Sequence, residues 1–328
     1  MITIRAQVSI GLGLLAALLG AGCTNTPQER VIYPGTSLNG QPVRMILDTG
    51  APETGLFKAG AERIGLKYAE FDRPVRLTST HASVGYTAPT ELFAGAQRLV
   101  GPFPVLEWGD DRVTEDGLIG WSDIRNNILV FDGEKHTITA VDAVPAEAQT
   151  WLKLKVHPAN VLQLEIQLAN GSTGVLLVDT GWQGGVALSN AQWKIWRNNR
   201  PFARSDQLTI TGPSIAETER TEAWADVLRI GPLTLTDLPV REAVEVELDL
   251  TQDFAGSLGL YAIKRMDFIV DGINGYAYLR PKNPPGPPYY IRRPSVADNQ
   301  YVPQDWVVLG DARLVPGLLR RTVPWARP

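Results

Sequence analysis

Short apolar runs separated by turn residues dominate the chain between residues 31 and 280. Two of these runs, residues 43–47 and 174–178, are preceded at the same interval by Asn-Gly, which is a strong hairpin signal between apolar strands. Two others, residues 128–131 and 268–270, lead directly into an Asp-Gly turn. Strand-length apolar runs bounded by Gly, Pro and Asn favour a mainly β fold with little helix.

The apolar runs at 43–47 and 174–178 both end in the same tripeptide, Asp-Thr-Gly. A lone Asp-Thr-Gly is weak evidence, because turns use these residues for ordinary conformational reasons. Here the surroundings repeat as well: Gly-Leu-Ile-Gly at 117–120 corresponds to Gly-Ser-Leu-Gly at 256–259, and in both copies the Asp of the Asp-Gly turn is the twelfth residue after the last glycine. The chain is therefore an internal duplication of one β-rich unit, with a period too long for a solenoid.

Residues 56–66 and 189–198 have helical spacing, one segment after each tripeptide. In the second, Trp193 and Trp196 lie at i and i+3, which we interpret as core packing rather than ligand recognition. Residues 143–150 are predicted to be a linker. We call residues 31–142 lobe 1 and residues 151–280 lobe 2.

This frame of hairpin, strand, Asp-Thr-Gly and late apolar-apolar-Gly segment resembles the retropepsin-like and pepsin-like aspartic peptidases. In that family each lobe supplies one Asp, and the two carboxylates meet at the lobe interface. The resemblance implies a mainly β, bilobed aspartic-peptidase-like fold, with two duplicated β-barrel lobes and a cleft between them. The sequence looks like the single-chain arrangement built from retropepsin-sized lobes, so we expect a monomer.

The resemblance implies that Asp48 and Asp179 are the catalytic pair. Two carboxylates about 3 Å apart cannot both ionise readily, so they share one proton and titrate together. The ionised partner takes a proton from a bound water, and the other donates a proton to the carbonyl oxygen of the scissile amide. The sequence does not say which of the two carboxyl groups carries the proton.

The resemblance also implies supporting residues. The threonines would hydrogen-bond across the lobe interface, and the glycines would permit the tight turn that aims each carboxylate. These loop residues are Thr49, Gly50, Thr180 and Gly181. Flap hairpins would exclude water and clamp an extended substrate. The candidates for the flap tips are Gly85, Tyr86 and Gly212.

The residue after each tripeptide differs between the lobes. Ala51 follows the first, as in retroviral enzymes, whereas Trp182 follows the second, where the family usually has Ser, Thr or Ala. The indole either fills part of the cleft or turns back into lobe 2. The first outcome would favour a duplicated fold that no longer cleaves peptides.

Residues 1–22 are similar to a bacterial lipoprotein signal peptide. Arg5 precedes an apolar stretch, residues 10–19, which is too short for a comfortable transmembrane helix. Small residues then lead to Cys23, the only cysteine, and the resemblance implies that this thiol is lipidated. Residues 23–30 would form a tether. Because Thr24 stands where an inner-membrane retention signal has Asp, we expect the periplasmic face of the outer membrane if the host has two membranes. The alternative is an ordinary secretory signal with an incidental cysteine.

Residues 281–328 form a proline-rich extension that is basic, with seven Lys or Arg against three Asp. Proline-dense segments favour extended conformations. We interpret this extension as a segment that wraps a lobe, with a peptide-like docking motif as the alternative.

Composition excludes several function classes. The net charge is −4 and no basic stretch is interleaved with aromatic residues, so we expect no nucleic-acid partner. The three histidines show no metal-ligand spacing, and we predict no metal and no cofactor.

The sequence therefore predicts an aspartic endopeptidase of the cell envelope. Its predicted partners are a peptide or protein substrate and the membrane, through a lipid on Cys23. The alternative is a non-catalytic peptide-binding or sensing lipoprotein with a peptidase-like fold. A structural lipoprotein of the envelope is a third reading, but it gives no reason for both tripeptides.

Overall fold

The computed structural model describes residues 30–76, 81–108, 114–132, 137–199, 205–210, 218–243, 254–282, 290–291 and 307–308. The predicted signal peptide and Cys23, most of the tether, Gly212 and most of the C-terminal extension lie outside these ranges. Of the helices within them, none combines the length and the apolar character that a membrane span requires.

Lobe 1 is built from short strands with two helices of one to two turns. The strands are β1 (Ile32–Tyr33), β2 (Thr36–Leu38), β3 (Gln41–Pro42), β4 (Met45–Asp48), β5 (Gly55–Phe57), β6 (Tyr68–Arg76), β7 (His81–Thr87), β8 (Thr90–Ala94), β9 (Gln97–Gly101), β10 (Pro104–Trp108), β11 (Gly117–Gly120), β12 (Ile128–Asp132) and β13 (Thr137–Val141). The helices are α1 (Lys58–Arg63) and α2 (Trp121–Ile124). A 3-10 helix, η1 (Ala146–Thr150), follows in the predicted linker.

Lobe 2 contains the two longest strands of the described residues, which have 13 and 10 residues. The strands are β14 (Leu152–His157), β15 (Gln163–Gln167), β16 (Thr173–Val178), β17 (Val186–Leu188), β18 (Ser205–Ile210), β19 (Thr218–Ile230), β20 (Leu233–Glu242), β21 (Phe254–Leu258), β22 (Met266–Asp271) and β23 (Tyr276–Pro281). The helices are α3 (Asn190–Asn198) and α4 (Leu260–Ile263). In the extension, β24 (Tyr290–Ile291) pairs with β25 (Val307–Val308).

The strand pairing around the two tripeptides is the same in both lobes. β4, which ends at Asp48, runs parallel to β11, so that Asp48 lies opposite Gly120. In lobe 2, β16 runs parallel to β21, with Val178 opposite Leu258. β5 and β17 then pair antiparallel with β11 and β21. The structure therefore repeats in space the unit that the sequence repeats along the chain.

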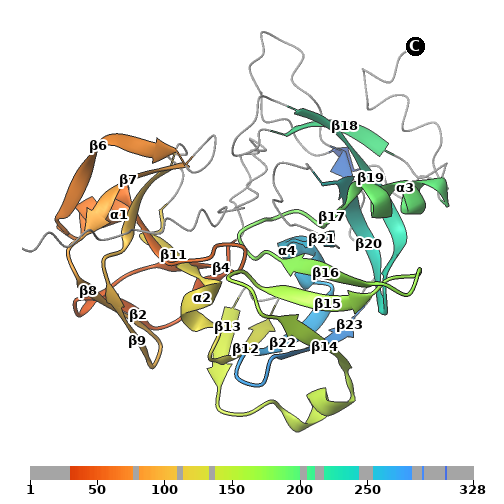
Figure 1. Ribbon diagram of the computed structural model, residues 1–328, viewed down its shortest axis with the longest axis horizontal. Coiled ribbons are helices and arrows are strands. Elements are labelled where there is room, and N and C mark those ends of the chain that lie inside the picture. Colours follow the sequence, from red (N-terminus) through yellow and green to blue (C-terminus); the bar gives the residue numbers. More distant parts are fainter. Residues whose placement is uncertain are drawn as a thin grey trace, which may run out of the picture.

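One sheet continues across both lobes because β12 pairs antiparallel with β22. In the register of this pair, Val130 lies opposite Ile269. These two residues are the tenth after Gly120 and Gly259, so they occupy the same position in the two copies of the repeat. The contact has the self-complementary pattern of a two-fold symmetric interface. In Figure 1 β12, β22 and β14 lie together below β4 and β16.

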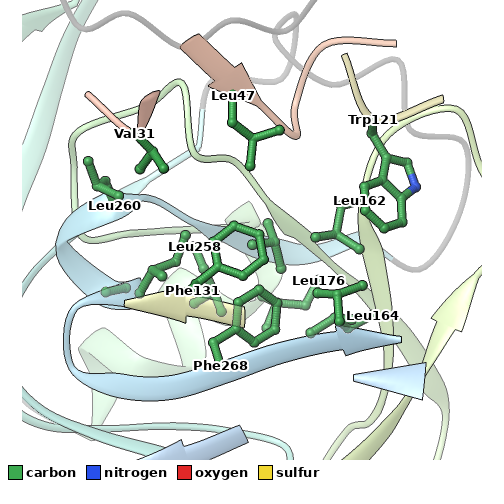
Figure 2. Packing of buried hydrophobic residues seen from close by; sticks show 14 of the residues in the cluster. Val31, Leu47, Trp121, Phe131, Leu162, Leu164, Leu176, Leu258, Leu260 and Phe268 are labelled. Carbon is green, nitrogen blue, oxygen red and sulfur yellow. The ribbon is translucent and has the colours of Figure 1, made fainter. Parts of the chain in front are cut away.

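The hydrophobic core is continuous across the lobes. Phe131 of β12 and Phe268 of β22 lie with ring centroids 5.0 Å apart at its centre (Figure 2). Leu47, the residue before Asp48, and Leu176 of β16 belong to the same buried cluster. Separating the lobes would expose this shared apolar surface to water, which is strongly unfavourable. The strands that carry the two tripeptides are thus fixed in one core.

The predicted mainly β class is confirmed. The lobes are not closed barrels within the described residues, however. A closed barrel would require the edge strands of each lobe to pair with each other, whereas β12 of lobe 1 pairs with β22 of lobe 2. The cleft between the lobes stays a prediction.

The helix predicted over residues 189–198 is confirmed as α3, whose first turn is capped by the Ser189 side chain accepting from the Gln192 backbone N–H. Trp193 and Trp196 stack with centroids 5.3 Å apart, and Trp193 is buried in the core, as predicted. The helix predicted over residues 56–66 is shorter than expected. Its first residues belong instead to β5, because β5 fits between β10 and β11.

Candidate active site

The strand ends of β4 and β16 deliver the two Asp-Thr-Gly turns to the lobe interface. In lobe 1, Asp48 Oδ1 accepts the backbone N–H groups of Gly50 and Ala51 at 3.0 and 3.1 Å. In lobe 2, Asp179 Oδ1 accepts those of Gly181 and Trp182 at 2.9 and 3.1 Å. Each carboxyl group is therefore oriented by its own turn, with the same geometry in both lobes.

Thr49 and Thr180 lock the two turns together. The Thr49 N–H donates to Thr180 Oγ1 at 3.0 Å, and the Thr180 N–H donates to Thr49 Oγ1 at 3.1 Å. Each hydroxyl then donates to a backbone carbonyl of the other lobe: Thr49 to Val178 at 2.6 Å, and Thr180 to Leu47 at 2.7 Å. These are cross-lobe hydrogen bonds of the kind that the resemblance implies.

Gly50 and Gly181 meet a different need from the one predicted. Neither adopts a positive φ, so an unusual turn conformation is not the reason for glycine. A Cβ at Gly50 would lie 2.6 Å from Asp179 Cγ, and a Cβ at Gly181 would lie 2.6 Å from Asp48 Cγ. The glycines therefore make room for the carboxyl group of the opposite lobe.

The carboxyl groups of Asp48 and Asp179 are both buried, with 2% and 0% of each residue exposed. Burial raises the pKa of Asp48 to about 6, although the N–H donors of Gly50 and Ala51 and the contact with Asp179 oppose the rise. Burial, followed by the negative charge of Asp48, raises the pKa of Asp179 well above its usual range. Asp179 Oδ2 is buried and accepts no hydrogen bond from an N–H or hydroxyl group of the described residues. Such a pair favours retention of one shared proton.

The Trp182 indole packs within lobe 2. Only 5% of Trp182 is exposed, and its ring clusters with Ala187, Ala243 and Phe254. A Cβ at Gly184 would lie 2.2 Å from the ring, so this glycine is in close contact with the indole. Of the two predicted orientations, the structure has the one that turns back into the lobe.

A redistribution of side-chain volume between the lobes makes room for the indole. In lobe 1, the small Ala51 packs with Phe57, Leu106 and Leu118. The strand registers place Ser189, Ala243 and Ser257 at the corresponding positions of lobe 2. Three large side chains are thus replaced by small ones where alanine is replaced by tryptophan, and cores tolerate such exchanges when total volume is kept.

The predicted flap tip at Gly85 and Tyr86 was wrong in position. Both residues lie in β7, where Gly85 pairs with Glu70 and Tyr86 with Ala69 of β6. β6 ends at Arg76 and β7 begins at His81, so the connection between the two strands lies outside the described ranges. Tyr86 is 39% exposed and makes an edge-to-face contact with Phe71, at 5.6 Å between centroids. Gly212, in the connection from β18 to β19, lies outside the described part of the chain.

Sequence reasoning missed Arg241 of β20. Its guanidinium carbon lies 4.8 Å from the centre of the Trp182 ring, and only 4% of the residue is exposed. One signal was available in the sequence: Gly-Leu-Ile-Gly in lobe 1 becomes Gly-Ser-Leu-Gly in lobe 2, so that the large Leu118 is replaced by the small Ser257. Nothing in the sequence linked that difference to Arg241, because the contact depends on strand register. In the described residues no group of three or more His, Cys, Asp or Glu side chains is arranged to hold a metal ion.

Comparison with known proteins supports the resemblance. Residues 35–122 match the family model described as aspartyl protease. No curated protein matches the chain. The match contains Asp48, both residues that follow it in the tripeptide, and the Gly-Leu-Ile-Gly segment that pairs with β4. The resemblance to the retropepsin-like aspartyl proteases is therefore confirmed over this part of lobe 1, and it supports a general aspartic peptidase function for the chain.

Proposed function

We propose that this protein is an aspartic endopeptidase in which Asp48 and Asp179 act as one catalytic dyad. The observation that carries the proposal is the meeting of two buried carboxyl groups between interlocked turns, each against the glycine of the other lobe. The aspartyl protease match over residues 35–122 supports it independently. Burying two carboxyl groups destabilises the folded state, and a purely structural role for this pair would offer no evident benefit in return.

The reaction follows from sharing one proton. The ionised member of the dyad takes a proton from a water molecule, which attacks the carbonyl carbon of the scissile peptide bond. The protonated member donates to the carbonyl oxygen, and the resulting tetrahedral intermediate collapses as a proton passes to the leaving nitrogen. This chemistry needs neither a covalent intermediate nor a cofactor. We assign the two roles to the dyad jointly, because its apparent pKa values belong to the pair.

A pH optimum from mildly acidic to near-neutral follows from the electrostatics. Burial raises the pKa of both carboxyl groups, that of Asp48 to about 6, so the dyad keeps its proton at higher pH than ordinary carboxyl groups do. We expect cleavage of a peptide library in this range, with inhibition by a pepstatin-like compound. Peptide binding without cleavage at any pH would favour the alternative, a binding or sensing module.

We further propose that the mature protein is a lipid-anchored monomer of the cell envelope, on the periplasmic face of the outer membrane if the host has two membranes. The apolar leader that ends at Cys23 supports this location. Mass spectrometry is expected to find acyl chains on Cys23, and the protein is expected to leave the membrane fraction only when detergent is added. Cys23→Ser should release it without detergent. An unmodified Cys23 in a soluble mature protein would contradict the proposal.

A further inference from the structure

Residue 182 connects the Asp179 carboxyl group to the rest of lobe 2. Its backbone N–H donates to Asp179 Oδ1 at 3.1 Å, and its carbonyl accepts the N–H of Leu260, at the start of α4, at 2.7 Å. In lobe 1, Ala51 makes the same two hydrogen bonds, to Asp48 and from Trp121. The position of the backbone of residue 182, or of residue 51 in lobe 1, therefore sets the position of one of the two N–H donors that orient each carboxyl group.

The two lobes hold the backbone of the equivalent residues Ala51 and Trp182 in different ways. Ala51 contributes a methyl group to a cluster that Phe57, Leu106 and Leu118 fill. In lobe 2 the indole itself is the large member of the cluster, and its closest neighbours include glycines: a Cβ at Gly259 would lie 2.7 Å from the ring. The packing that immobilises residue 182 is thus supplied mainly by its own side chain.

Arg241 contacts the face of the Trp182 indole. The strand registers place Arg241 where lobe 1 has Pro104, so the cation occurs only in the lobe that has the tryptophan. The guanidinium carbon is 4.8 Å from the ring centre and the residue is buried, which is the geometry of a desolvated cation–π contact.

We propose that Trp182 is a positioning residue for Asp179: its indole, packed in lobe 2 and held by Arg241, fixes the backbone N–H that orients the Asp179 carboxyl group. This inference rests on the proposed peptidase function only for its kinetic readout. The orientation of the carboxyl group also affects its proton affinity, which can be measured without any substrate.

In the described part of the chain, charged groups face residue 182 and Asp179 from β4, β20 and β19. Asp48 faces Asp179 from β4. Arg241 contacts the indole from β20, and Glu222 of β19 lies opposite Arg241 across the strand pair. A loss of the oriented N–H would weaken stabilisation of the ionised dyad, so its apparent pKa values would rise.

Trp182→Ala is the first test. We expect kcat to fall roughly 10- to 100-fold with KM little changed, because a misplaced carboxyl group affects the transition state more than binding. The acidic limb of the pH profile should move to higher pH. In urea unfolding, the stability of the wild type should fall as pH rises, and Asp179→Asn should reduce this fall because one of the two buried carboxyl groups is removed. In Trp182→Ala the fall should extend to higher pH. Arg241→Met should shift both profiles in the same direction by less.

A rescue variant separates positioning from other roles. Trp182→Ala combined with Ala243→Leu and Ser257→Leu gives lobe 2 two of the large side chains of lobe 1, and it should recover stability, kcat and the pH profile together. Trp193→Phe is the matched control: it perturbs a buried tryptophan of the same lobe and should lower stability without moving the pH profile.

Three outcomes would overturn the proposal. The first is a destabilised Trp182→Ala variant with the wild-type kcat and pH profile. The second is a rescue variant that regains stability while its pH profile stays shifted. The third outcome applies if the rescue variant does not fold: an Arg241→Met variant whose pH dependence of unfolding equals that of the wild type would then contradict the proposal. A wild type without peptidase activity would defeat the proposed function alone, since the unfolding profiles would still report the position of the carboxyl group.

Discussion

Replacing either dyad carboxyl group by an amide is expected to abolish peptide cleavage while making the folded protein more stable at neutral pH. Asp48→Asn and Asp179→Asn should each lower kcat by roughly 10³- to 10⁴-fold, because a dyad that shares one proton loses both its acid and its base when one member cannot ionise. The amide oxygen can still accept the two backbone N–H groups that each carboxyl group accepts now. The turn should therefore keep its shape.

The gain in stability follows from the direction of the pKa shifts. Burial raises the pKa of both carboxyl groups in the folded protein, so between pH 4 and 6 the folded state binds more protons than the unfolded chain. Stability contributed by these groups is present at low pH and is lost as pH rises through the folded pKa values. Because the amide removes a buried ionisable group, the variants should gain on the order of 1–3 kcal/mol in free energy of unfolding at pH 7.

Asp267→Asn provides the matched control. Asp267 lies away from the dyad on β22, where hydrogen bonds from Lys282 and Arg280 outweigh its partial burial and lower its pKa. Its contribution to stability is therefore present at neutral pH and is lost on acidification, the opposite of the dyad. Asp267→Asn should retain cleavage and lose a little stability at pH 7. Dyad variants that cleave peptides, or that are less stable than the wild type at pH 7, would contradict the assignment.

The sequence could predict what depends on repetition and local chemistry. The matched intervals around the tripeptides predicted a duplicated, mainly β chain, and the helical spacing of residues 189–198, with Trp193 and Trp196 at i and i+3, predicted α3. The sequence could not predict that lobe 1 does not close into a barrel in the described residues. β12 pairs with β13 on one side, and closure depends on whether its other side pairs with a second strand of lobe 1 or, as observed, with β22 of lobe 2. Alternation alone carries no information on the partner strand.

The candidate site shows the same division. Asp48 and Asp179 stood out because they end equivalent strands. The conformational reason expected for Gly50 and Gly181 was wrong, because the constraint on each glycine comes from a carboxyl group far away in the chain, 129 residues away for Gly50 and 133 for Gly181. The flap tip was misplaced at Tyr86 because strand alternation extends through the base of a hairpin and does not mark its turn. Contacts of high sequence separation decide each of these points.

The threonine pair that joins the two turns should be needed both for stability and for catalysis. Thr49→Val and Thr180→Val keep the shape of the side chain but remove a hydroxyl that accepts one backbone N–H and donates to one carbonyl, all in a buried interface. Leaving such groups unsatisfied costs about 1–3 kcal/mol each, so each variant, which leaves two groups unsatisfied, should lose about 2–6 kcal/mol in free energy of unfolding. Thr49→Ser and Thr180→Ser keep the hydroxyl and should lose less.

The two valine variants should combine non-additively both in stability and in activity. The hydroxyl oxygens of Thr49 and Thr180 lie 3.4 Å apart and belong to one hydrogen-bond network, so the loss of stability in the double variant should be smaller than the sum of the single losses. Either single substitution already frees one turn relative to the other, and both carboxyl groups must be in place for one reaction. The loss of kcat in the double variant should therefore be well below the product of the single losses, as for residues that act as a unit. Urea unfolding and steady-state kinetics on the same four proteins measure both quantities. Additive effects on kcat would mean that the threonines stabilise the lobe interface without setting the geometry of the dyad.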